Sequence, residues 1–304
     1  MQLILKNTGS NNRLDNWLKG FKDVDPSLLL EIDLTEKKFV AKGFPETRVI
    51  VKCTELSFEE AGYELSELLN NEGESLLTKT KKLSSKVATE FTGDNRIKVG
   101  IYNIVGKLIE VINLYAGAEH TLTVSFDTCK NVKYVKASTT IEQWQAERMT
   151  FKSMSLIMNV NCSQLSEFFY FLRDDIFNNV VCNLDTPAEF VTTTETIANL
   201  HKISNLFTSD KQTDTIKFYT KMKDDHIALY ALDNRENHYD YLVGFLKDPN
   251  APITSGAEVT VGRENFIKAT RGLTGEIGLT VSQVSGSRLL VTAGTTKIIV
   301  ASMQ

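Results

Sequence analysis

The chain is poor in the residues that build metal centres and covalent cross-links. Its 304 residues include only four histidines and four cysteines. The cysteines, Cys53, Cys129, Cys162 and Cys182, lie 20 or more residues apart, and no Cys-x-x-Cys pair occurs. This spacing argues against a zinc knuckle and a redox dithiol. We therefore expect buried, reduced thiols that act as small hydrophobic residues, with neither a metal ion nor another cofactor.

Long apolar runs are also missing. No stretch approaches the roughly 20 apolar residues that a membrane-spanning helix needs. The segment Met1–Lys6 lacks a charged flank followed by a long apolar region, which is the pattern of a signal peptide. We therefore expect a cytoplasmic protein with no membrane partner.

Proline is scarce, whereas hydrophobic residues are common. The 5 prolines and the 42% hydrophobic content exclude a collagen-like or disordered chain. The length is sufficient for two domains with real cores. Because the net charge is −4, the average surface would repel DNA, and nucleic-acid binding would need a local concentration of positive charge.

Recognisable catalytic motifs are absent as well. The segment Gly100–Lys107 approaches a phosphate-binding loop, but five residues instead of four separate its glycines, and Leu108 stands where Ser or Thr should bind magnesium. The acidic pairs Asp174–Asp175 and Asp224–Asp225 occupy turn or linker positions, where solvated loop acids are the favoured interpretation. We expect no enzymatic activity, with a metal-dependent hydrolase or nuclease that uses Asp224 and Asp225 as an alternative.

Hydrophobic periodicity predicts four amphipathic helices, at 11–22, 104–115, 196–207 and 263–273. In the first, Leu14, Trp17, Leu18 and Phe21 recur at helical spacing. Runs typical of strands accompany them. These are 28–34, 38–44, 48–53, 96–102, 120–126, 132–140, 148–160, 215–221, 226–233, 239–246, 258–261, 277–283, 288–292 and 297–302.

The same unit, a strand and a helix followed by two or three antiparallel strands, therefore occurs four times. The tetrapeptide Leu-Thr-Val-Ser follows the helix in the second and fourth units, at 122–125 and 279–282, which favours an internal duplication. We predict an α+β fold of two domains, with helices on one sheet face. The domains would be 1–163, with an inserted and mobile excursion at about 64–94, and 187–304, joined by a connector at 164–186.

Positive charge is concentrated in the predicted helices. They carry eight basic residues against three acidic ones, an excess of five. If the apolar stripes pack on the sheet, these basic side chains point outward together; the alternative is that they only increase solubility. The basic residues are Arg13, Lys19, Lys22, Lys107, Lys202, Arg263, Lys268 and Arg271.

The order of these elements resembles that of DNA sliding clamps, the processivity factors of DNA replication. The segments that carry the resemblance are Met1–Leu5 before the first helix, Arg96–Tyr102 before the second, and the final hairpin Arg288–Ser302. The resemblance covers most of the chain apart from 64–94 and parts of 141–185. The two-domain clamps of T-even-type bacteriophages are the most similar members.

The resemblance implies a homotrimeric ring whose helices surround double-stranded DNA without reading its sequence. Such a viral protein would tether a DNA polymerase in the host cytoplasm, and an ATP-dependent clamp loader would open it. Partners of related clamps insert apolar peptides beside the connector and the C-terminal strands, which here suggests a groove at Phe171, Ile176, Val300 and Met303. The alternative function is a viral β-rich structural or assembly protein that oligomerises without a DNA channel.

Overall fold

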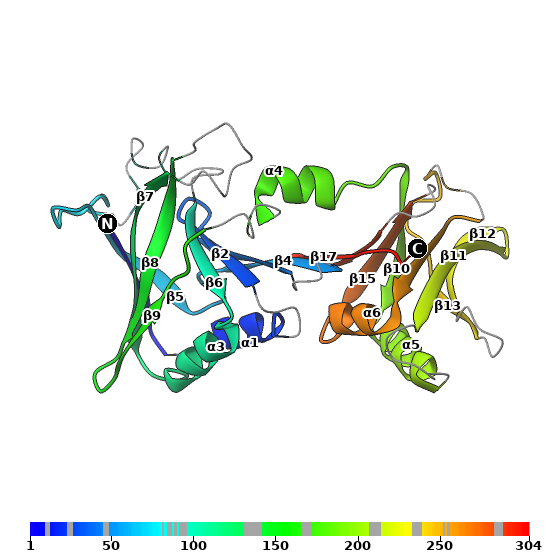
Figure 1. Ribbon diagram of the computed structural model, residues 1–304, viewed down its shortest axis with the longest axis horizontal. Helices are drawn as coiled ribbons and strands as arrows, with labels where there is room; N and C mark the ends of the chain where they lie inside the picture. The colour runs from blue at the N-terminus through cyan, green and yellow to red at the C-terminus, as the bar shows by residue number, and fades with distance from the viewer. Residues whose placement is uncertain are drawn as a thin grey trace. The chain divides into compact units, whose positions relative to one another are not determined.

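The protein forms two compact units in the computed structural model (Figure 1), and each is described by itself. The first unit contains Met1–Glu46 and Cys53–Phe177, and the second contains Thr47–Lys52 and Asn178–Gln304. The structure describes residues 1–9, 13–22, 27–44, 49–80, 82–83, 87, 90, 96–130, 142–165, 169, 172–206, 214–232, 239–251, 253, 256–282 and 288–303.

The first unit contains two antiparallel sheets. Its elements are β1 (Gln2–Asn7), α1 (Leu14–Lys19), β2 (Ser27–Asp33), β3 (Lys38–Phe44), β4 (Ile50–Ser57, whose first residues belong to the second unit), β5 (Tyr63–Leu69), β6 (Ile97–Tyr102), α3 (Val105–Leu114), β7 (His120–Lys130), β8 (Glu142–Lys152), β9 (Ile157–Asn161) and α4 (Asp174–Ile176). One sheet has the order β5–β1–β7–β8–β9, and the other includes β3–β2–β6. They meet where β6 pairs in parallel with β8 at Lys98 and Gln145.

Both sheets bury one face against the helices, as alternating apolar residues predict. Leu122 and Val124 of β7 are fully buried, whereas Thr121 and Thr123 between them are partly exposed. Helices α1 and α3 lie side by side (Figure 1). Leu18 and Ile112 are among the helical residues that contribute to the same core.

The second unit repeats this plan. Its elements are a π-helical turn (Phe177–Val181) shared with the first unit, β10 (Pro187–Thr193), α5 (Thr194–Leu206), β11 (Thr215–Lys223), β12 (His226–Leu232), β13 (Asp240–Leu246), β14 (Glu258–Gly262), α6 (Arg263–Thr270), β15 (Glu276–Ser282), β16 (Leu289–Ala293) and β17 (Thr296–Val300). The strands form one antiparallel order, β14–β11–β12–β13–β10–β15–β16–β17. Helices α5 and α6 contact each other, and Phe266 of α6 packs on Phe218 of β11.

The fourfold repeat of strand, helix and antiparallel strands is confirmed. The two copies of the Leu-Thr-Val-Ser tetrapeptide occupy equivalent strands, β7 and β15, and their Leu and Val side chains are buried in both. Each of the four helices begins and ends within three residues of the bounds that the sequence predicts. Their ends differ because helix termini lack the regular spacing of apolar residues.

The predicted excursion at 64–94 is wrong over its first part, because β5 occupies Tyr63–Leu69 and pairs with β1. A register shift at Ser66 places Leu65 and Leu68 on the buried face. Such a bulge interrupts the two-residue alternation by which a strand is recognised. Two further antiparallel bridges follow, at Leu69–Ser75 and Leu77–Leu83.

The other differences in strands are local. The predicted strand 148–160 is the hairpin of β8 and β9, whose turn is closed by a hydrogen bond from Ser153 N to Leu156 O (2.9 Å). Strand β10 was not predicted. The predicted strand 132–140 lies outside the described residues. The connector contains helix α4 and the π-helical turn that follows it.

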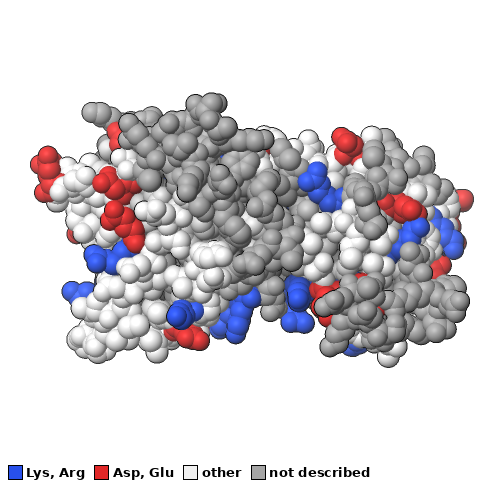
Figure 2. Space-filling model, in the orientation of Figure 1, with Lys and Arg blue, Asp and Glu red and all other residues white. Residues whose placement is uncertain are grey.

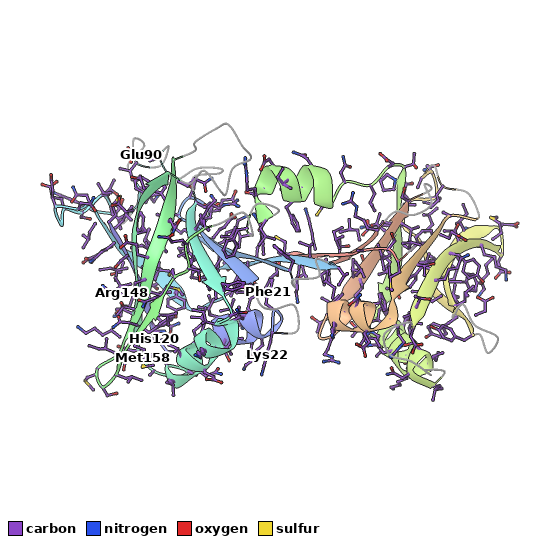
Figure 3. The ribbon with its side chains drawn as sticks, viewed as in Figure 1. Phe21, Lys22, Glu90, His120, Arg148 and Met158 are labelled. Atoms are coloured by element: carbon purple, nitrogen blue, oxygen red, sulfur yellow. The ribbon has the colours of Figure 1, made fainter. Side chains whose placement is uncertain are left out.

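A buried histidine ties β7 to β5 in the first unit. It is His120, the first residue of β7, and is labelled in Figure 3. His120 lies within hydrogen-bond distance of Tyr63 Oη through Nε2 (2.8 Å) and of Ala118 O through Nδ1 (2.8 Å). Both contacts suit the neutral imidazole, with its proton on Nδ1. Burial lowers the pKa of His120, and the bond to Ala118 only partly offsets this effect.

We therefore predict that the free energy of unfolding decreases as the pH falls from 7.5 to 5. The unfolded chain takes up a proton at an ordinary imidazole pKa of about 6.5, whereas the folded chain resists protonation. Stability due to neutral His120 is present above that pKa and is lost below it. Urea unfolding at several pH values should show a smaller dependence in His120→Gln and an unchanged one in a control, His226→Gln, which alters an exposed residue. Equal slopes in the wild type and in His120→Gln would contradict the prediction.

Candidate nucleic-acid interface

Helices α1 and α3 carry exposed basic side chains on the side away from the sheets. Lys19 is in the last turn of α1, and Lys22 follows that helix. Arg13 precedes α1, and Lys107 lies in the first turn of α3. All four are exposed, and Lys and Arg side chains gather over this edge of the unit in Figure 2.

One of these cations already has an intrahelical partner. Lys19 Nζ lies 2.8 Å from Asp15 Oδ2, one helical turn earlier. Because Asp15 is largely buried and Lys19 is 46% exposed, the pair holds the lysine on the helix surface. Its ammonium group remains accessible to a further anion.

The second unit presents a smaller basic surface. Lys202 of α5, Lys268 of α6 and Arg271 just after α6 are exposed. His201 Nε2 lies 2.7 Å from Thr270 Oγ1, which joins the two helices. Burial lowers the pKa of His201, and the positive charge of Arg271 lowers it further.

Arg263 is not part of an exposed surface, so the prediction that its side chain points outward is wrong. Its side chain is 7% exposed, and Nε lies 3.4 Å from Asp214 Oδ2. Its Nη1 also donates a hydrogen bond to Asn205 Oδ1 at the end of α5. As the first residue of α6, Arg263 is directed towards the neighbouring elements α5 and β11, where it neutralises a buried carboxylate.

The positive charge of the helices is smaller than the sequence predicts. Helix α5 begins at Thr194, two residues earlier than expected, and so includes the exposed Glu195. Without Arg263, seven accessible basic residues remain against four acidic ones, which are Asp15, paired with Lys19, and Glu110, Glu195 and Glu264. The remaining excess is still positive, on a chain whose net charge is −4. Such a surface suits contacts to phosphate groups, which need no fixed register.

The alternative catalytic residues do not form a site within the described part of the chain. Asp224 and Asp225 form the turn between β11 and β12, both with positive φ. Asp174 and Asp175 are paired with basic side chains. Across the described residues, no group of three or more His, Cys, Asp and Glu side chains could hold a metal ion. None of the helices there has the length and apolar character needed to cross a membrane.

The four residues suggested for a partner groove have different environments. Val300 is fully buried in β17, which makes it a core residue of the second unit that a partner cannot reach. Ile176 is half-buried in α4, and Met303 is 40% exposed. The backbone of Met303 is fixed by a hydrogen bond from its N–H to Thr260 O (2.8 Å). Phe171 lies outside the described residues.

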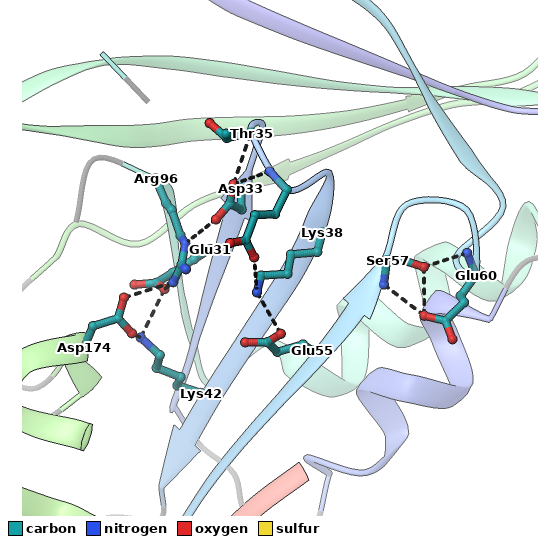
Figure 4. Close-up of polar contacts among 11 residues, drawn as sticks. Glu31, Asp33, Thr35, Lys38, Lys42, Glu55, Ser57, Glu60, Arg96 and Asp174 are labelled. Atoms are coloured by element: carbon teal, nitrogen blue, oxygen red, sulfur yellow. Dashed lines mark hydrogen bonds and ion pairs between the residues drawn. The ribbon is translucent and has the colours of Figure 1, made fainter. Parts of the chain in front are cut away.

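A buried ionic cluster in the first unit was not anticipated (Figure 4). Lys42 Nζ lies 3.1 Å from Glu31 Oε2 and 2.5 Å from Asp174 Oδ1. Arg96 contacts the same two carboxylates at 3.2 and 2.9 Å, and Asp33 at 2.8 Å. Lys42 and Glu31 are almost fully buried.

The pKa values in this cluster follow from pairing. Burial alone would lower the pKa of Lys42, but Glu31 and Asp174 outweigh it and hold that pKa above its usual value. Burial alone would raise the pKa of Asp174, but Lys42 and Arg96 hold it below its usual value. The alternation of Glu31 and Asp33 with apolar residues was visible in the sequence. The contact of these residues with Asp174 could not be seen in the sequence, because Asp174 lies 141 positions after Asp33.

Each of the two units contains the repeat of strand, helix and antiparallel strands twice, with its pair of helices packed on apolar sheet faces. This arrangement defines the two-domain sliding-clamp fold. The structure is similar to a crystal structure of the PCNA2–PCNA3 complex from Sulfolobus tokodaii, with a TM-score of 0.54 and 13% identity. The match covers 99% of each chain. It is also similar to PCNA of A. fulgidus, bound there to the C-terminal region of FEN-1 (TM-score 0.53, 9% identity, covering 99% of this chain and 98% of that one).

Bacterial clamps share the fold but are longer. The β sliding clamp of C. crescentus matches all of this chain with a TM-score of 0.61 and 11% identity, while the chain spans 65% of that protein. A scan of protein-family models finds no match to the sequence, and neither does a search of curated proteins. The similarity is therefore one of fold.

We predict that Arg263 stabilises the second unit, whereas the exposed Lys268 of the same helix does not. Replacing Arg263 by Met leaves Asp214 buried without its arginine, so the free energy of unfolding should fall by about 3 kcal/mol. The matched change Lys268→Met alters an exposed residue and should cost less than about 0.5 kcal/mol. Urea unfolding of both variants checks this. Equal losses would show that the Arg263–Asp214 pair contributes no special stability.

Proposed function

We propose that the protein is a sliding clamp, a non-enzymatic processivity factor that encircles duplex DNA and tethers a replicative DNA polymerase. The observation that carries the proposal is the combination of the clamp fold with exposed basic side chains on the helices of both units, in a chain of negative net charge. Lys22, Lys107 and Lys268 are examples of these side chains.

Contacts of this kind would hold DNA without fixing its register. The side chains are long and exposed, and they would meet phosphates at a distance that water can bridge. Sliding requires attraction that is independent of sequence, and phosphates provide it because they are identical along the helix. The basic residues proposed for this role are Arg13, Lys19, Lys22, Lys107, Lys202, Lys268 and Arg271.

A ring also requires an edge strand that can pair with another subunit. In the described part of the chain, β9 pairs with β8 on one side only. Cys162 N donates to Glu147 O (2.8 Å), so by alternation the amides of Val160 and Met158 face β8. The amides of Asn159 and Asn161 therefore face away from β8 and are available to a neighbouring strand.

The proposed assembly is a homotrimer, as in the two-domain clamps of T-even-type bacteriophages that the sequence resembles. Three copies of a two-domain chain would supply six units to a closed ring, which removes unpaired sheet edges. A viral origin, host cytoplasmic location and an ATP-dependent clamp loader are parts of the same proposal. A closed ring cannot leave DNA sideways, so processivity would come from topology.

Two structural relatives support a role in partner binding. The A. fulgidus protein has the C-terminal region of FEN-1 bound to it. The β clamp of Helicobacter pylori, whose TM-score to this structure is 0.58, has a DNA ligase peptide bound to it. By analogy, we propose that Phe171, Ile176 and Met303 contribute to a groove for apolar peptides of a polymerase or loader. The competing function is a β-rich structural or assembly protein, which would oligomerise without binding DNA.

The ring proposal predicts a species of three times the 34.1 kDa chain mass in light scattering across a dilution series. Asn159→Pro removes an outward-facing amide and leaves the backbone hydrogen bonds between β8 and β9 in place, so it should shift the protein to monomer. It also removes the hydrogen bond from Thr150 Oγ1 to Asn159 Oδ1 (2.7 Å). Asn159→Ala keeps the amide and should remain trimeric. A wild-type protein that is monomeric at high concentration would overturn the ring.

The DNA proposal predicts that reversing three helix charges weakens binding to duplex DNA and reduces its salt dependence. The test variant combines Lys19→Glu, Lys202→Glu and Lys268→Glu. A control with the same net charge combines Lys6→Glu, Lys152→Glu and Lys297→Glu, which are exposed residues on strands. Loss of each phosphate contact should reduce the slope of log K against log salt by about 0.9. Anisotropy titrations at several salt concentrations measure this, and equal effects in both variants would exclude the helices as the DNA surface.

A further inference from the structure

The sheet β3–β2–β6 has two opposite faces of contrasting character, and both are buried. Leu28, Leu30 and Ile32 of β2 belong to the hydrophobic core. By alternation, Glu31 and Asp33 point to the other face, together with Lys42 of β3 and Lys98 of β6. The buried Leu29 of β2 lies on that face as well. Charged residues on a sheet face normally contact water, yet the buried residues here include Glu31 (1% exposed), Asp33 (4%), Lys42 (1%) and Lys98 (3%).

The start of the connector covers this charged face. Asp174, the first residue of α4, accepts hydrogen bonds from Lys42 and Arg96. Phe169, which precedes α4 in the connector, lies next to Gly100 of β6. A Cβ atom added at Gly100 would be 3.5 Å from the ring of Phe169. Leu172 and Phe177, which flank α4, are also buried.

Charge balance explains why a carboxylate is needed at this position. Lys38 of β3 is on the same face but is already balanced, because it pairs with Glu36 and Glu55. Of the other five charged side chains that the sheet and its margin contribute, Lys42, Lys98 and Arg96 are positive, while Glu31 and Asp33 are negative. Asp174 supplies the missing negative charge. The adjacent Asp175 does not take part, because it is 45% exposed and paired with Arg173 at 3.0 Å.

We propose that residues 172–177 form a strap, closed over the first unit by the carboxylate of Asp174. Opening the strap breaks its contacts with Lys42 and Arg96 and uncovers a charged sheet face. The hydrophobic core lies on the opposite face of the sheet and stays closed. The strap can therefore open without unfolding the unit, and the open state presents a site with excess positive charge. The burial of Leu172 and Phe177 favours the closed state, and Asp174 fixes its position.

Hydrogen–deuterium exchange of the full-length chain tests the strap, with Asp174→Asn as the opening variant. Asp175→Asn is the matched control, since it removes the same charge one residue later. Asp174→Glu restores the charge with a longer side chain. Losing hydrogen bonds to two charged partners should accelerate amide exchange in peptides covering 172–181 about tenfold. Labelling of the half-buried Cys182 by a thiol reagent, located by peptide mass, provides a second readout beside the strap.

The expected result is faster exchange at 172–181 in Asp174→Asn, unchanged exchange in β2, β3 and β6, and wild-type behaviour in Asp175→Asn. Asp174→Glu should recover most of the protection. Equal exchange in the two Asn variants would overturn the proposal. So would a matching acceleration in β2, β3 and β6, because Asp174 would then stabilise the whole unit instead of a strap. Failure of Asp174→Glu to recover protection would exclude charge as the closing interaction.

Discussion

The packing of apolar sheet faces against pairs of helices is the interaction on which both units depend. In the first unit, Leu18 of α1 and Ile112 of α3 enter a core formed with strand residues such as Val124. In the second, Leu200 of α5 and Phe266 of α6 are fully buried. Because one side of each helix is committed to this packing, its other side must face solvent. The basic surface proposed to meet DNA follows directly from the way the cores are closed.

Two buried ion pairs are exceptions to this plan, and both occur where segments distant in sequence meet. Arg263 joins the start of α6 to Asp214, and Lys42 joins β3 to the connector through Asp174. Removing charges from water is costly, so such pairs contribute less to stability than their short distances suggest. They are selective, however, because each accepts only a partner of opposite charge in one position. We infer that they determine which segment docks where, while the apolar faces provide most of the favourable energy.

The helices and most described strands could be predicted because their amphipathic periodicity is local. Leu14, Leu18 and Phe21 mark α1 without any knowledge of the rest of the chain. Strand β5 escaped detection because a bulge at Ser66 interrupts its alternation. The exposed lysines of the candidate site could also be identified from their helical positions. The burial of Arg263 could not, since it depends on Asp214, which lies 49 positions earlier in the sequence. The ionic cluster is likewise a product of tertiary structure.

The close approach of the Ser163 backbone to Gly100 has a consequence for how short motifs are interpreted. A Cβ atom at this position would lie 2.5 Å from Ser163 O, and Ser163 N donates a hydrogen bond to Gly100 O (2.7 Å). The glycine is therefore required by the approach of two backbones. This same glycine opens the segment that approaches a nucleotide-binding loop in the sequence. Steric exclusion between two backbones is thus sufficient to require the glycine that opens such a segment, without reference to a nucleotide.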